Sequence, residues 1–163
     1  MILIQKLDPV EDFKMWYMNN RILRPPLDSN MIVADNFYNT ATLFSDGQFQ
    51  VELVIAKPHS RSPQHRHPNM DAMEVYLGGH LALTVNDEIN LSHEMAKERN
   101  DGASSMLYES IRIRPEDWHG GSSGRFGGMF LSIQHWQNGV KPTSVVKDVI
   151  FLNKEDENIA VSL

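Results

Sequence analysis

The stretch HRHPNMDAMEVYLGG, residues 65–79, places two histidines one residue apart, followed by two carboxylates and a pair of glycines. On a β-strand, residues i and i+2 point to the same face, so the imidazoles of His65 and His67 would lie side by side. A single buried histidine is usually a hydrogen-bonded core residue, but two on one face need two separate partners in the same place. Two neutral imidazoles together favour a divalent metal ion. The stretch therefore predicts a metal site on the covered face of a strand.

A third nitrogen ligand is expected from IRIRPEDWHGG, residues 111–121. Here a strand of alternating Ile and Arg ends at Pro115, and the chain re-enters at Trp118 and His119. A turn followed by an inward histidine can bring His119 opposite the first two imidazoles. The chain has no cysteine, which excludes disulfides, thiolate metal ligands and a cysteine nucleophile. Histidine, aspartate and glutamate are left to carry any chemistry.

The residues around these stretches have the pattern of a β-sheet. Between residues 49 and 55, apolar residues alternate with Gln50 and Glu52, which is the period of a sheet with one covered face. Segments 81–85, 105–115 and 128–136 continue this character, and turns are expected at Gly78-Gly79, Asp101-Gly102 and Gly127-Gly128. Many short strands between turn signals predict an antiparallel barrel or a double-sheet jelly roll. The polar segment 90–102 is expected to be a short surface helix or loop.

A short helix is predicted near the N-terminus. Asp8 can cap it, Pro9 suits its first position, and Glu11 stands where the acid of a capping box reaches back. Aromatic residues at positions 13, 16 and 17 share one face, which predicts core packing or, as the alternative, a lid or dimer surface. RPPLDSN, residues 24–30, is expected to form a turn or an extended linker.

Length and charge limit the classes of protein. With 163 residues, 41% of them hydrophobic, the chain suits one domain spanning residues 1–163. Within it we expect a helix and linker over about 1–36, a barrel over about 37–152 and a tail over about 153–163. A formal net charge of −6 with scattered basic residues offers no footprint for nucleic acid or a membrane surface. The chain has neither a signal-peptide core nor a long apolar run, so a cytoplasmic protein is expected.

The two stretches together resemble the two motifs of the cupin superfamily. The first motif of that family is HxH, a short gap, Glu, then six residues to Gly, and the second is a proline-containing turn followed by His. Here they read SPQHRHPNMDAMEVYLGGHLALTV and IRIRPEDWHGG, and the resemblance extends loosely over about residues 44–137. It implies a small antiparallel jelly-roll β-barrel with His65, His67 and His119 as metal ligands.

One position departs from the cupin pattern. Counting back from Gly79, the glutamate of the family falls at position 72, where this chain has Ala72. This looks like the cupins that bind iron through three histidines, such as gentisate-type ring-cleaving dioxygenases. Glu74 shares a face with position 72, whereas Asp71 lies on the opposite face of a regular strand. Three roles stay open for Glu74: a fourth ligand in a shifted hairpin, a carboxylate that orients substrate or water, or a partner in an ion pair at the barrel end.

Other polar residues on the predicted strands have weaker signals. His135 shares parity with Leu131 and Ile133, so it could enter the barrel as a proton shuttle or support for the ligands, or be a hydrogen-bonded core or rim histidine. Arg112 and Arg114 alternate away from the Ile face and are expected to be solvated.

We therefore predict a mononuclear metal enzyme of the cupin type. The resemblance favours a non-haem Fe(II) oxygenase or dioxygenase acting on a small organic substrate, with Glu74 and His135 as catalytic residues. A metal-assisted isomerase, lyase or hydrolase using Zn, Mn or Ni and Glu74 as base is the first alternative. A non-catalytic small-molecule-binding barrel is the second. A homodimer is also expected.

Overall fold

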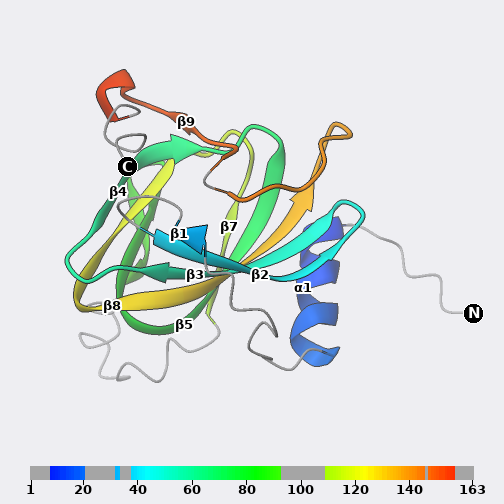
Figure 1. Ribbon diagram of the computed structural model, residues 1–163, viewed down its shortest axis with the longest axis horizontal. Coiled ribbons are helices and arrows are strands. Elements are labelled where there is room, and N and C mark those ends of the chain that lie inside the picture. The colour runs from blue at the N-terminus through cyan, green and yellow to red at the C-terminus, as the bar shows by residue number, and fades with distance from the viewer. Residues whose placement is uncertain (1–7, 21–31, 34–37, 93–108, 146, 157–163) are drawn as a thin grey trace, which may run out of the picture.

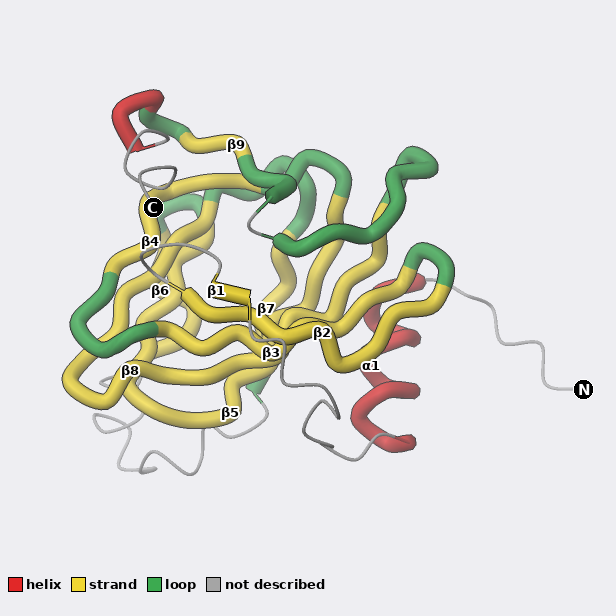
Figure 2. Tube along the Cα trace, in the orientation of Figure 1, coloured by secondary structure: helices red, strands yellow, loops and turns green. Residues whose placement is uncertain are grey.

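The computed structural model describes residues 8–20, 32–33, 38–92, 109–145 and 147–156 (Figure 1). Its elements are α1 (Pro9–Asn20), β1 (Ile32–Val33), β2 (Tyr38–Asp46), β3 (Phe49–Ala56), β4 (Arg61–Arg66), β5 (Met70–Val85), β6 (Glu88–Ser92), β7 (Ser110–Ile113), β8 (His119–Trp136) and β9 (Ile150–Phe151). All strand pairs are antiparallel, and the strands curve into a barrel with α1 beside it (Figure 2). The predicted all-β jelly roll with a short N-terminal helix is confirmed. None of the described helices is long and apolar enough to cross a membrane.

Two long strands, β5 and β8, form the frame of the barrel. They pair along almost their whole lengths, from Met70 opposite Trp136 to Val85 opposite His119. The C-terminal half of β8 also pairs with β3, and its N-terminal half pairs with β4. Each long strand therefore takes part in both walls of the barrel. β1 pairs with β2 and β9 pairs with β4, so the sheet already includes residues 32–33, which were expected in the linker.

The glycine pairs 78–79 and 127–128 were expected to be turns, and this is wrong. Both pairs lie inside the long strands, where the register of β5 on β8 shifts on either side of Gly78 and Gly79. Gly79 has a φ of +86°, and a Cβ atom there would lie 2.5 Å from the carbonyl oxygen of Gly127. Glycine is required because the two backbones cross closely while the strands bend from one wall to the other. Asp101-Gly102 lies outside the described residues.

We call the sheet of β3, the C-terminal half of β8 and the N-terminal half of β5 the central wall. Both of its faces are covered, contrary to the prediction of a single covered face for residues 49–55. Gln50 and Glu52 face the barrel interior and are 5% and 1% exposed. On the other face of the wall lies α1 (Figure 1). The helix packs there over an apolar cluster. Its buried members are Val10, Phe13, Tyr17, Val51, Met73, Val75, Leu131 and Ile133. The polar residues of β3 therefore line the inside, and its apolar residues hold the helix.

The helix begins as predicted. The backbone N–H of Glu11 donates to the carboxylate of Asp8 at 3.4 Å, so Asp8 is the N-cap. The carboxylate of Glu11 does not reach back but pairs with Lys14 at 2.6 Å. Phe13 and Tyr17 are buried, which confirms core packing, while Trp16 remains 49% exposed.

Two other predicted segments fall largely outside the described residues, namely the linker 24–30 and residues 93–102. Residues 90–92 belong to β6 rather than to a surface helix or loop.

An ion-pair cluster joins α1 to the barrel wall. Arg112 was expected to be solvated, but its guanidinium donates two hydrogen bonds to Asp71, at 2.7 and 2.5 Å, and one to Asp8 at 2.5 Å. Only 23% of the Arg112 side chain and 10% of the Asp71 side chain are exposed. Arg114 is exposed, as predicted. The guanidinium holds the pKa of Asp8 below its ordinary value.

Replacing Arg112 by Met should lower the free energy of unfolding by about 1–2 kcal/mol, because Asp71 loses its cation while still largely buried. Urea titrations measure this loss. Asp71→Asn should cost a similar amount, and the double variant should cost less than the sum of the two. Metal content should not change in any of these variants, because Asp71 faces away from the barrel interior. A large metal loss from Asp71→Asn alone would contradict that placement.

Candidate metal centre

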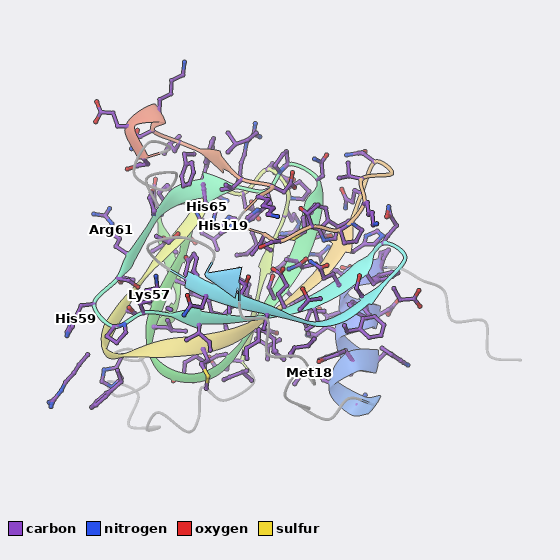
Figure 3. The ribbon with its side chains drawn as sticks, in the orientation of Figure 1. Met18, Lys57, His59, Arg61, His65 and His119 are labelled. Atoms are coloured by element: carbon purple, nitrogen blue, oxygen red, sulfur yellow. The ribbon has the colours of Figure 1, made fainter. Side chains whose placement is uncertain are left out.

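The three predicted histidines meet inside the barrel. His65 lies on β4, His67 follows that strand directly, and His119 begins β8, where it pairs in register with His65. Their ligating nitrogens all lie within 4.8 Å of one another, and each side chain is at most 7% exposed. Figure 3 shows His65 and His119 side by side near the β9 end of the barrel. Two motifs far apart in sequence thus supply one cluster.

Backbone carbonyls orient all three imidazoles. The Nδ1 atom lies 2.7 Å from the carbonyl oxygen of Pro63 in His65, 2.7 Å from that of Asp148 in His67, and 3.0 Å from that of Asp117 in His119. A carbonyl oxygen can only accept, so each Nδ1 carries the proton and each neutral ring keeps its lone pair on Nε2. This is the outer hydrogen bonding that fixes the tautomer of metal-binding histidines. The donor set therefore fits a divalent metal ion held by three Nε2 atoms.

The electrostatics of the cluster agree with this assignment. Burial and the neighbouring His65 lower the pKa of His67 to about 3. Burial, together with His65 and His67, also holds the pKa of His119 well below its ordinary value. Neutral imidazole is the form that coordinates a metal ion. His67 and His119 are thus in the binding-competent form across the physiological pH range.

The carboxylates near the first motif lie where the strand parity predicted. Ala72 and Glu74 face the barrel interior, at 1% and 9% exposure, while Asp71 faces α1 and pairs with Arg112. Within the described residues, the cluster of ligating atoms contains the three histidines and no carboxylate, which does not support Glu74 as a fourth ligand. No ion pair to Glu74 is found in the described part of the chain, so the barrel-end ion pair is not supported either. Burial raises the pKa of Glu74 to about 8.

His135 does not enter the barrel. Its ring stacks on Phe49, with centroids 4.9 Å apart, and it pairs in register with Asp71 on the face that α1 covers. The shared parity with Leu131 and Ile133 was correct, but that parity belongs to the outer face of β8. The placement removes the basis for His135 as a proton shuttle or as support for the ligands.

A polar wall inside the barrel was missed by sequence reasoning. It consists of Gln50, Glu52, Ser132, Gln134 and the indole N–H of Trp136, and all five residues are at most 5% exposed. The signal was present in the alternation of β3 and of residues 131–136. It was read with the polar residues facing outward, because a covered outer face gives the same pattern.

Comparisons with known proteins establish the fold. No family model and no curated protein matches the sequence. A cupin-2 domain protein from Rhodospirillum rubrum matches the structure with a TM-score of 0.53 and 13% identity over 77% of this chain and 72% of that one. A cupin 2 domain-containing protein from Halorhodospira halophila gives 0.51 and 13% over 74% and 73%, and KdgF from Halomonas sp. gives 0.50 and 10% over 64% and 84%.

The chain has the cupin fold, and its three-histidine cluster fits a metal-binding cupin. At these identities the similarity extends to the fold alone, so the reaction has to be argued from the site.

Proposed function

We propose that this chain is a non-haem Fe(II) oxygenase, of the dioxygenase type, that acts on a small organic substrate. The observation that carries the proposal is the donor set: three neutral imidazoles oriented by backbone carbonyls, with Ala72 at the position of the family carboxylate. Neutral ligands do not offset the dipositive charge of the metal ion. An Fe(II) ion held by three such nitrogens supplies open positions for a chelating anionic substrate and for dioxygen.

The residues of the chain have separate tasks in this proposal. His65, His67 and His119 hold the ion, and the carbonyls that accept from their Nδ1 atoms keep the rings in place. Barrel walls that bury all three rings exclude bulk water from the site. Glu74 points into the same interior, where it can orient the substrate or accept a proton from it. Mn, Ni or Zn fits the same three nitrogens, so the choice of Fe(II) rests on the open positions and on the resemblance.

One observation favours a different reaction. The pKa of Glu74, about 8, lies near the working pH of most proteins, which suits a general base. A metal-assisted isomerase or lyase, with Glu74 removing a proton from a substrate polarised by Zn or Mn, is therefore the second candidate. A non-catalytic small-molecule-binding barrel and a homodimer remain predictions of the sequence.

Metal loading and gas reactivity separate these functions. The protein as purified should contain iron by elemental analysis, and Fe(II)-loaded protein should give a spin-resonance signal with nitric oxide, which stands in for dioxygen. Oxygen consumption should then be measured with a panel of small chelating acids. If Fe(II)-loaded protein gives no signal and Zn or Mn supports turnover without oxygen, the oxygenase proposal fails and the isomerase or lyase replaces it. Stoichiometric binding without turnover under any metal would identify a binding protein.

A further inference from the structure

The side chains of the polar wall of the barrel interior hydrogen-bond to one another. Gln134 is its centre: the amide oxygen accepts from the indole N–H of Trp136 at 2.9 Å and from Gln50 at 3.1 Å. The amide nitrogen of Gln134 donates to Ser132 at 3.1 Å and to Glu52 at 3.4 Å. An amide side chain offers two donors and one oxygen with two lone pairs, so Gln134 has no capacity left.

Glu52 is also held within this wall. Its carboxylate accepts from the backbone N–H of Val145 at 3.2 Å as well as from Gln134. Gln50 makes a second bond, to the carbonyl oxygen of Thr143 at 2.7 Å. These contacts tie the wall to the segment that precedes β9.

Glu74 is the exception in this wall. Ser132 pairs in register with Glu52 on one side and with Glu74 on the other, so the two glutamates flank it on neighbouring strands. Unlike Glu52, Glu74 has no hydrogen-bond or ion-pair partner in the described part of the chain, although its side chain is more than nine-tenths buried. A buried polar group without a partner costs free energy, and such groups are rare in native proteins. Glu74 keeps 9% of its residue surface accessible, and its carboxyl is on the face of β5 that lines the barrel interior.

The charged residues of the barrel core indicate what kind of group could pair with Glu74. The buried charged residues that the structure describes are Glu52, Asp71 and Glu74, with no lysine or arginine among them. Asp71 is on the outer face and already has Arg112. The described core therefore supplies no cation for the ionised form of Glu74, and in the protein alone burial keeps this carboxyl protonated below a pKa of about 8. Position 74 lies about 7 Å further along the strand than position 72, the place of the family carboxylate, so a molecule bound at the histidines can reach it.

We propose that Glu74 is the recognition group for a small organic ligand that carries a protonated amine, with an anionic end directed to the three-histidine centre. This inference deepens the proposed function by naming a class of substrate. The anionic end of the ligand rests on the proposed metal centre, whereas the amine end rests on Glu74. The amine donates to the Glu74 carboxylate and supplies the missing counter-charge.

A matched set of ligands tests the recognition without turnover. Calorimetry on Zn-loaded protein should compare γ-aminobutyrate, γ-hydroxybutyrate and butyrate, which differ only at the end away from the carboxylate. At about pH 8.5 the Glu74 carboxyl is ionised while the amine is still protonated, so a hydrogen bond between charged groups can form. Under these conditions the amine should bind at least about tenfold more tightly than either analogue. Glu74→Gln should remove this preference and leave butyrate binding within about twofold. The exposed control Glu116→Gln should keep both the preference and the butyrate affinity of the wild type.

The same comparison in metal-free protein separates this inference from the metal chemistry. Butylamine should bind more tightly than butanol to wild-type protein after chelation, and Glu74→Gln should abolish the difference. Equal binding of the amine and its neutral analogues by wild-type protein overturns the inference, whether or not the variant folds. A preference that survives Glu74→Gln overturns it as well. Missing iron or missing reactivity with nitric oxide would instead overturn the proposed oxygenase.

Discussion

Alanine at any one of His65, His67 or His119 should empty the metal centre. Each ring contributes one of three nitrogens, and within the described residues no carboxylate joins the ligating cluster to compensate for a lost ring. Loss of an outer hydrogen-bond partner of a ligand typically weakens metal binding about 10–100-fold, and loss of the ligand itself should exceed that range. Elemental analysis after dialysis against a weak chelator measures the remaining metal. We expect near-complete loss in each variant.

The matched control is His59→Ala, because His59 is exposed and lies outside the cluster. It should keep the metal content of the wild-type protein. The three ligand variants should keep the far-ultraviolet circular dichroism of the barrel, since separate apolar clusters hold the fold together. A ligand variant that stays folded and retains full metal content would show that its histidine is not a ligand.

Two of the three ligands were accessible to sequence reasoning because their pairing depends on local geometry, whereas His119 was expected from the proline-containing turn of the second stretch. The i, i+2 rule for a strand places His65 and His67 on one face whatever the rest of the chain does. Within β5, the same rule placed Ala72 and Glu74 together on one face and Asp71 on the other, as the structure shows. The Nδ1 bonds could not be predicted, because their acceptors are backbone carbonyls and one of them, on Asp148, belongs to a segment far along the chain.

The inside and outside of the central wall could not be told apart from sequence. Alternation gives two faces but does not say which one encloses the barrel, and here α1 covers the outer face with apolar contacts. The polar residues were therefore assigned to solvent, in error. Of the two interpretations left open for His135, the one inside the barrel loses its basis, because the ring lies on the outer face. The glycine pairs misled for a related reason: a positive φ serves a bend inside a long strand as well as a turn between two strands. In both cases the deciding contact comes from a strand or helix distant in sequence.

The unpaired carboxyl of Glu74 should make the stability of the metal-free protein depend strongly on pH. Burial raises its pKa from an ordinary value of 4.5 to about 8 in the folded state. Between these two values the folded protein holds a proton that the unfolded chain has lost, so stability falls as pH rises through this window. The slope contributed by one such group is up to about 1.4 kcal/mol per pH unit, which amounts to several kcal/mol across the window. Above the folded pKa the curve should level off.

Glu74→Gln should flatten this dependence, because the amide does not titrate. Urea unfolding from about pH 4.5 to 8.5 in the presence of a chelator gives both curves. The amide adds buried donors, so the variant carries a constant offset, and the result to compare is the slope rather than the height of each curve. A slope of the same sign should remain in the variant, since burial also raises the pKa of Glu52. The exposed control Glu116→Gln should run parallel to the wild type. If the Glu74→Gln curve also runs parallel to the wild type, the carboxyl of Glu74 is paired or hydrated in solution and does not need a cationic ligand.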